Sequence, residues 1–355
     1  MFLHRLLTNN CPKSPAFLPL LALVIMVAKP ATIMSNAFIP SGVGAGNDPQ
    51  PAGASRRTGA GERIDPLWGA IVEDAPAWLE MPNDPHQLYS EYKFAGLAGH
   101  LIAYKVVDAS DCPANGFLPN GAANDCGLLR ALPAVFEWQN RFDAAILETS
   151  QETGIPPILL KNLFAWESQF WPKTVFVNTY EYGLGHITEM GADSSLRWNA
   201  PFYDDICAGS FSAETCKKPY AGQPANIRAA LMGVVIQQVN ADCANCLYGL
   251  DLTLAERSIP VFAKTVLANA SLVKQYVSGL TGRPAAKSVE YEDLWKFTLA
   301  SYNAGPGCFT IAFSRTLNTR LPLDWKNLST QLDPGCQGAI NYVNFISQSD
   351  YYGSP

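Results

Sequence analysis

The sequence predicts a mainly α-helical fold. Apolar residues recur at helical spacing through much of the chain, whereas stretches that alternate apolar with polar residues are few. Residues 174–177 are the only stretch that favours a short strand. No segment of about 20 to 50 residues repeats, which argues against a solenoid.

The N-terminal segment is typical of an export signal. Basic residues precede an apolar run over residues 16–28, which has the length of a signal-peptide core and is short for a membrane span. Ser35 and Ala37 are small residues suited to cleavage, so we expect residues 1–37 to be a signal peptide. An uncleaved N-terminal anchor is the alternative. Both predict an exported protein that is secreted, periplasmic or associated with the cell wall.

Residues 38–64 are rich in Gly, Ala, Pro and Ser and poor in large apolar residues. Such a segment buries too little surface to offset its ordering entropy, so it predicts a flexible linker. Residues 65–150 are expected to form an N-terminal helical extension. Within it, residues 131–150 have the spacing of one long amphipathic helix.

Further helices are predicted from the same spacing. The first of them begins with Pro156 and Pro157, which the first turn accepts because no hydrogen bond is lost there. The predicted ranges are 155–167, 227–240, 258–280, 291–301 and 338–348.

The cysteines favour disulfides in an oxidising compartment, because an even set lies beyond the predicted signal. They are Cys112, Cys126, Cys207, Cys216, Cys243, Cys246, Cys308 and Cys336. The simplest pairing joins sequence neighbours: 112 with 126, 207 with 216, 243 with 246 and 308 with 336. Cys243 and Cys246 could instead form a redox motif or half of a zinc site, although no second pair of zinc ligands follows at a suitable spacing.

Charge and motifs exclude several classes of function. The net charge is −6 and no basic run follows the N-terminal segment, so neither nucleic acid nor an anionic membrane is an expected partner. The chain has no HExxH zinc motif, no Gly-rich phosphate loop and no Ser-centred elbow. We therefore expect no metal and no cofactor.

Glu167 is the strongest candidate for a catalytic residue. It lies at the predicted C-terminal end of the helix over 155–167, beside Trp166 and Phe170. The negative end of the helix dipole and apolar surroundings both favour a protonated carboxyl. A general acid needs this form to cleave a glycosidic bond. The alternative is a solvated glutamate at a helix end, which is the more common case for a lone residue.

Glu167 belongs to the first of three motifs. They are Glu167-Ser168 with Phe170 and Pro172, the segment Tyr182-Gly183-Leu184-Gly185-His186-Ile187-Thr188, and the segment Tyr302-Asn303-Ala304-Gly305-Pro306-Gly307. In this order they resemble the soluble lytic transglycosylase family, whose catalytic domain is similar to goose-type lysozyme. The resemblance covers residues 154–188 and 293–346, where Asn341-Tyr342-Val343 is similar to the family's closing helix.

The resemblance implies a goose-type lysozyme-like domain over residues 151–348 that cleaves peptidoglycan glycan strands. Glu167 would protonate the glycosidic oxygen between N-acetylmuramic acid and N-acetylglucosamine. It would then draw a proton from the muramoyl C6 hydroxyl, which closes a 1,6-anhydro ring. One carboxyl suffices because the nucleophile belongs to the substrate, whereas hydrolysis usually needs two. The resemblance also implies substrate-binding roles for Ser168, Gly183, Leu184, His186, Tyr302 and Asn303.

The chain departs from the family in two places. Members usually carry Gln where His186 stands, and often Met where Gly185 stands. A neutral His can donate and accept like Gln, but its reach differs and its charge depends on pH. The second departure is an extra stretch at about 193–287, which contains four of the cysteines. It predicts an inserted lobe that covers the cleft or binds a protein partner.

Two other functions stay open. A muramidase or chitinase-type glycoside hydrolase on the same fold would need a second carboxylate. The candidates are Glu181, Glu189, Asp193, Asp204 and Asp205. Glu189 and Asp193 also fit the first turns of a helix capped by Thr188. A catalytically inactive glycan-binding or scaffold protein is the other alternative, and His186 in the Gln position favours it.

Overall fold

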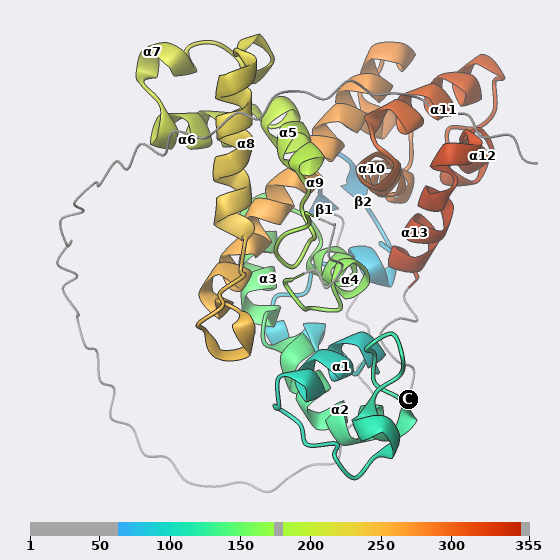
Figure 1. Ribbon diagram of the computed structural model, residues 1–355. Coiled ribbons are helices and arrows are strands. Elements are labelled where there is room, and N and C mark those ends of the chain that lie inside the picture. The colour runs from blue at the N-terminus through green and yellow to red at the C-terminus, as the bar shows by residue number, and fades with distance from the viewer. Residues whose placement is uncertain (1–62, 174–179, 349–355) are drawn as a thin grey trace, which may run out of the picture. The chain divides into compact units, whose positions relative to one another are not determined.

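The computed structural model describes residues 63–173 and 180–348, which are mainly α-helical, as predicted (Figure 1). The helices are α1 (Ala95–Ala103), α2 (Asp125–Asn140), α3 (Asp143–Thr153), α4 (Pro157–Glu167), α5 (Glu189–Trp198), α6 (Ala200–Ser210), α7 (Ala213–Cys216), α8 (Ala225–Val239), α9 (Leu252–Thr281), α10 (Tyr291–Ala304), α11 (Pro306–Asn318), α12 (Trp325–Thr330) and α13 (Gly338–Ile346). The predicted signal peptide, most of the predicted linker and the predicted strand over 174–177 lie outside the described residues.

Helices α4, α8, α9, α10 and α13 confirm the five ranges predicted from apolar spacing, with shifted ends. The single helix predicted over 131–150 is wrong, because the chain breaks between α2 and α3 at Arg141 and Phe142. At this break Phe142 is buried in the core, and Asp143 forms a buried ion pair with Lys161 of α4 at 2.7 Å. Apolar spacing alone does not detect such a turn.

A two-stranded antiparallel sheet begins the described chain. β1 (Arg63–Ile64) pairs with β2 (Ile71–Val72), with Arg63 opposite Val72 and Ile64 opposite Ile71. Neither strand is predicted by the sequence pattern, and Arg63 and Ile64 fall within the predicted linker. The segment between the strands is held by Asp65, whose carboxylate accepts the backbone N–H groups of Leu67 and Trp68.

The main hydrophobic core extends from Trp68 to Ile346, so the predicted N-terminal extension contributes to it. The Trp68 indole packs edge-on against Trp295 of α10, with ring centroids 5.7 Å apart. The Tyr291 hydroxyl donates to the buried Asp65 carboxylate at 3.0 Å. The beginning of the described chain therefore packs against the helix that carries Tyr302.

A second, smaller core joins α5, α6 and α8. Its buried residues run from Ala192 to Val235 and include Cys207, which forms a disulfide with Cys216. Helix α9 instead supplies many residues of the main core, among them Phe262 and Val273. The stretch predicted as an inserted lobe therefore divides between the two cores. Helices α5, α6 and α8 form the smaller core, whereas α9 packs in the main core.

The four disulfides join the pairs predicted from the sequence: Cys112–Cys126, Cys207–Cys216, Cys243–Cys246 and Cys308–Cys336. They indicate that the protein folds in an oxidising compartment, as an exported protein does. Over residues 63–173 and 180–348, no helix combines the length and the apolar character that crossing a membrane requires.

Candidate active site

Helix α4 positions Glu167. This helix is buried on most of its faces, and its residues Leu159, Leu163 and Phe164 pack in the main core. The helix ends at Glu167, after which Gln169 and Phe170 adopt positive φ angles of 49° and 62°. Few non-glycine residues adopt this conformation, and it is maintained here by packing. The Phe170 ring is buried, and its carbonyl accepts the Trp138 indole N–H at 2.9 Å.

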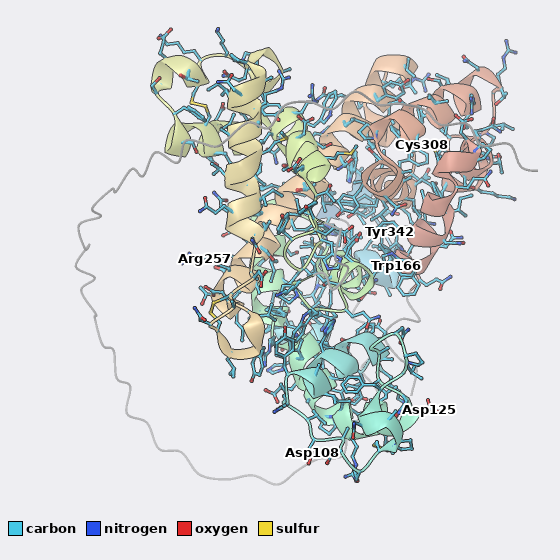
Figure 2. All side chains as sticks on the ribbon, in the orientation of Figure 1. Asp108, Asp125, Trp166, Arg257, Cys308 and Tyr342 are labelled. Carbon is cyan, nitrogen blue, oxygen red and sulfur yellow. A yellow bond between two sulfur atoms is a disulfide. The ribbon has the colours of Figure 1, made fainter. Side chains whose placement is uncertain are left out.

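Tyr342 holds the Glu167 carboxyl from the other end of the chain. Its hydroxyl donates to Glu167 Oε1 at 2.6 Å. Tyr342 lies on α13, and the neighbouring Trp166 of α4 packs on Phe345 of the same helix, with ring centroids 4.0 Å apart. The labels of Trp166 and Tyr342 lie close together in Figure 2, and the two rings pack edge-on with centroids 6.1 Å apart. From the sequence, Tyr342 is expected only as part of a closing helix, and its hydrogen bond to Glu167 is not predicted.

The pKa of Glu167 is raised to about 7, mainly because burial disfavours the ionised carboxylate. The negative charge of Glu181 raises the pKa further, whereas the hydrogen bond from Tyr342 favours the carboxylate and lowers it. The position at the C-terminal end of α4 also favours the protonated form. Glu167 can therefore give and take a proton near neutral pH.

The second motif forms a tight hairpin against α9. Tyr182 and Ile187 exchange two backbone hydrogen bonds, and the residues between them form the turn. A Cβ atom added to Gly185 would lie 1.9 Å from Cδ2 of Phe262, so no larger residue fits without displacing that ring. Gly183 has a φ of +71° and lies against Ser258 of the same helix. Both glycines are thus required by packing on α9.

His186 closes this hairpin with a φ of +47° and faces Glu181, with 3.7 Å between Nδ1 and Oε2. Burial lowers the pKa of His186 to about 4, although the nearby Trp171 backbone acts in the opposite direction. The imidazole is therefore neutral near pH 7, and its contact with Glu181 is not an ion pair. His186 therefore gains the predicted positive charge only under acidic conditions.

Tyr302 connects the third motif to the hairpin. Its hydroxyl donates to the Gly185 carbonyl oxygen at 3.1 Å, and its ring packs edge-on against Phe262. Burial and the charges of Glu167 and Glu181 raise the pKa of Tyr302 well above its usual value, so the hydroxyl remains a donor. The hydrogen bond to Glu167 comes from Tyr342, and Tyr302 fixes the hairpin beside it.

These groups surround one cavity of about 300 Å³. Of the predicted site residues, Glu167, His186, Tyr302 and Asn303 line it. The other three, Ser168, Gly183 and Leu184, lie behind the wall: the Ser168 hydroxyl donates to the Phe164 carbonyl, and the Leu184 side chain is buried. Their roles in substrate binding stay predictions. The cavity is also lined by Glu181, Thr265, Asn269 and Ser301, to which sequence analysis assigns no binding role.

No match to a known protein was found. No family model matches the chain, no curated protein matches it, and no solved structure matches it. The functional assignment therefore depends on the chemistry of the cavity and on the three motifs.

The aromatic residues near Glu167 differ in what they can contact. Trp171 is buried and stacks between His100 and Trp138, at centroid distances of 4.6 and 5.0 Å, so it is a core residue. Trp166, which precedes Glu167 in the sequence, is 41% exposed, and an exposed indole can stack on a sugar ring. In the described residues, no group of three or more His, Cys, Asp or Glu side chains could hold a metal ion.

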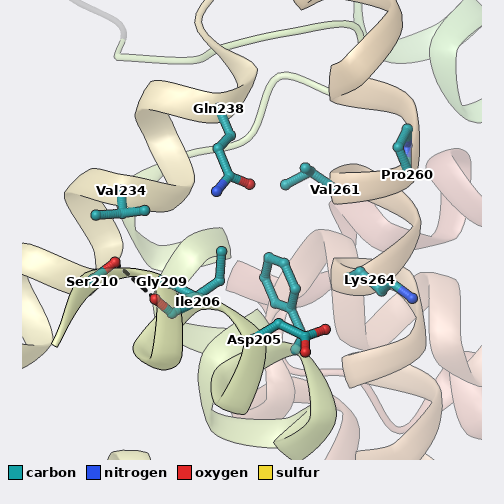
Figure 3. A pocket seen from close by; sticks show the side chains of 10 residues that line it. Asp205, Ile206, Gly209, Ser210, Val234, Gln238, Pro260, Val261 and Lys264 are labelled. Carbon is teal, nitrogen blue, oxygen red and sulfur yellow. Dashed lines mark hydrogen bonds between the residues drawn. The ribbon is translucent and has the colours of Figure 1, made fainter. Parts of the chain in front are cut away.

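A second cavity of about 340 Å³ lies between α6, α8 and α9 (Figure 3). Phe202, Ile206 and Val261 form its apolar walls, and Asp205 and Lys264 lie at its edge. It contains none of the predicted site residues. The protein partner predicted for the inserted lobe stays a prediction.

Proposed function

We propose that this protein is an exported lytic transglycosylase with a goose-type lysozyme-like catalytic domain. Its substrate would be the β-1,4 bond between N-acetylmuramic acid and N-acetylglucosamine in peptidoglycan. The observation that carries the proposal is the Glu167 carboxyl, which faces a cavity, accepts a hydrogen bond from Tyr342 and has a pKa near neutrality. A general acid works best with a pKa near the operating pH.

In the proposed reaction, protonated Glu167 donates its proton to the glycosidic oxygen, and the bond to the muramoyl C1 breaks. The resulting carboxylate accepts the proton of the muramoyl C6 hydroxyl, whose oxygen attacks C1 and closes the 1,6-anhydro ring. Tyr342 supports the first half of this cycle, because its hydrogen bond is stronger to the carboxylate that forms when the proton leaves than to the acid. No water molecule is consumed.

The convergence of the motifs supports the proposal. Glu167, His186 and Tyr302 come from three separate segments of the sequence, and they line one cavity. The departure at Gly185 is compensated by packing, because the Phe262 ring occupies the space where the family's Met side chain would begin. A hairpin in the family's place can therefore be retained without that Met.

A glycoside hydrolase is the second candidate, and Glu181 favours it. Glu181 lines the same cavity as Glu167, and its charge contributes to the raised pKa of Glu167. In a hydrolase with two carboxyls, Glu181 would activate the attacking water while Glu167 protonates the leaving group. Each of the two candidates requires Glu167 and predicts a different product.

Product analysis on purified peptidoglycan separates these possibilities. We expect 1,6-anhydromuramoyl ends by mass spectrometry and a loss of about 100- to 10,000-fold in rate for Glu167→Gln. Glu181→Gln should retain activity in a transglycosylase, and so should the control Glu189→Gln, whose residue is exposed on the first turn of α5. If the unaltered protein forms reducing ends and Glu181→Gln does not, the protein is a hydrolase. Glycan binding without cleavage by the unaltered protein would establish a binding protein.

A further inference from the structure

The cavity of about 340 Å³ between α6, α8 and α9 shares no residue with the Glu167 cavity (Figure 3). We call it the lobe cavity. Its volume lies at the small end of the range of about 300–1,000 Å³ that is usual for small-molecule sites. It therefore suits a small ligand rather than a folded partner.

Two residues that are unfavourable in helices line the lobe cavity. Gly209 lies in α6, and a Cβ atom added there would meet no atom within 4 Å. Pro260 lies inside α9, where it cannot donate the helical backbone hydrogen bond. Glycine and proline are the two least favourable residues inside a helix. The chain thus retains a space here that a single larger side chain in place of Gly209 would occupy.

The walls of the lobe cavity are apolar. Phe202 and Ile206 of α6 are buried, each 6% exposed, and Val261 of α9 packs against the same small core. Burying a polar group against such walls costs free energy unless the group finds a partner. The part of a ligand that enters the cavity is therefore apolar.

Three polar side chains border these walls: Asp205 of α6, Gln238 of α8 and Lys264 of α9. None of these side chains forms a hydrogen bond or an ion pair with another residue of 63–173 or 180–348. Figure 3 shows the Gln238 amide extending into the cavity from α8. One negative charge, one positive charge and one neutral amide are therefore available to a ligand.

These charges restrict what the lobe cavity can bind. The Asp205 carboxylate repels an anion, and the Lys264 ammonium group repels a cation. A ligand that carries one charge of each sign can pair with both residues. Charge complementarity therefore favours a small zwitterion with an apolar body.

We propose that the lobe cavity binds a short aliphatic peptide with free ends, of about the size of a dipeptide. Its ammonium group pairs with Asp205, and its carboxylate pairs with Lys264. The Gln238 amide, which can donate and accept, matches the N–H and C=O groups of the peptide bond. The aliphatic side chains lie against the apolar walls. This site goes beyond the proposed function and does not depend on it.

Calorimetric titration with alanyl-leucine at pH 7 tests the site. We expect a Kd of about 1 mM or tighter, an affinity that a ligand of this size can reach. Asp205→Asn should raise this Kd about 2- to 5-fold, the usual effect of losing an exposed ion pair. It should leave the Kd of N-acetyl-alanyl-leucine unchanged, because that probe has no ammonium group. Lys264→Met should act in the same way on alanyl-leucine and leave the Kd of alanyl-leucinamide, which has no carboxylate, unchanged.

Filling the lobe cavity gives a second readout. Gly209→Leu should abolish binding of all three probes. Its Tm should be unchanged or higher, because a Cβ atom at Gly209 meets no neighbour and leucine favours a helix more than glycine does. The matched control is Gly233→Leu on α8, because a Cβ atom there also meets open space and Gly233 lines neither cavity. This control should bind the probes as the unaltered protein does.

The inference is overturned if alanyl-leucine does not bind at about 10 mM, or if Gly209→Leu binds it as the unaltered protein does. Free leucine that binds as tightly as alanyl-leucine would also overturn it, because the peptide bond would then not be recognised. So would a charge variant that weakens the probe lacking the matching charge as much as it weakens alanyl-leucine. These titrations contain no peptidoglycan, so failure of the inference and failure of the proposed function are distinguishable.

Discussion

At neutral pH about half of the Glu167 carboxyls carry a proton, because their pKa lies near 7. The same burial that makes this residue useful as an acid makes its ionised form costly to the folded protein. An unfolded glutamate ionises near pH 4.5, so the folded state binds a proton more tightly over the interval between these two values. Catalytic function and stability are therefore opposed at this residue.

Replacing this carboxyl should stabilise the protein in a pH-dependent way. We expect Glu167→Gln to raise the Tm at pH 8, where the buried charge destabilises the unaltered protein, and to have little effect below pH 4.5, where the carboxyl is protonated in both states. Calorimetry across this range measures the difference. The exposed Glu189→Gln is the control and should show no such trend. An equal Tm for Glu167→Gln and the unaltered protein at pH 8 would contradict the raised pKa.

Tyr342 should set the alkaline limit of activity. Its hydrogen bond lowers the pKa of Glu167, so Tyr342→Phe removes that influence and moves the alkaline limb of kcat/KM to higher pH. We also expect a loss of about 10- to 100-fold in rate, the usual effect of losing a hydrogen bond to a charged group. The matched control is Tyr276→Phe, whose hydroxyl contacts Thr310 and Ser314. An unshifted limb would show that Tyr342 does not tune Glu167.

At the scale of elements, the hairpin from Tyr182 to Ile187 is positioned by two contacts, the Phe262 ring behind Gly185 and the Tyr302 hydroxyl on its carbonyl. The first contact belongs to α9 and the second to α10. These two helices also line the cavity beside Glu167, with Thr265 and Asn269 on α9 and Ser301 on α10. The helices that position the hairpin are therefore the ones that also line the cavity.

The contact at Gly185 should tolerate no side chain. Gly185→Ala places its Cβ inside the Phe262 ring, and we expect it to destabilise the protein by about 1–3 kcal/mol and to reduce activity. Gly233→Ala on α8 is the control, because its Cβ meets open space. A second substitution, Phe262→Ala, should recover part of the loss in the double variant, which denaturant unfolding can measure as a coupling energy. Strict additivity would show that the two residues do not interact.

Sequence patterning predicts those elements whose apolar residues keep one period over several turns. Helices α4, α8, α9, α10 and α13 belong to this class, and Thr188 caps α5 as its residue type suggests, accepting the Gly191 N–H at 3.1 Å. The break before α3 was not predictable, because it depends on a buried ion pair with Lys161. Tyr342 could not be assigned either. Its role arises from the packing of helices that are far apart in the sequence.

At the scale of the whole molecule, disulfides fix the segments that carry the site. Cys308 lies at the start of α11, and Cys336 lies just before α13, which carries Tyr342. Removal of a disulfide that spans 28 residues costs about 3–4 kcal/mol, whereas one that spans three residues costs about 2 kcal/mol. The Cys308–Cys336 disulfide is therefore expected to stabilise the protein more than Cys243–Cys246 does. It also lies next to the helix that carries Tyr342.

Replacing both cysteines of the longer loop should affect stability and activity together. We expect the variant with Cys308→Ala and Cys336→Ala to lose about 3 kcal/mol of unfolding free energy and to cleave more slowly while still folded. The variant with Cys243→Ala and Cys246→Ala should lose less and retain its rate. Denaturant unfolding and activity at low temperature measure the two effects. Equal losses of rate in both variants would argue against a role for the Cys308–Cys336 disulfide in holding α13.

The contact between Asp65 and Tyr291 has a consequence for when the chain can fold. These two residues are 226 positions apart, and they bring the beginning of the described chain onto α10. Contacts of such high sequence separation form slowly, because a long loop must close before they contribute. During synthesis the segment around Asp65 therefore cannot make its native contacts until α10 has been made. The main core can therefore close only after the last third of the chain has been made, and until then its apolar faces stay exposed.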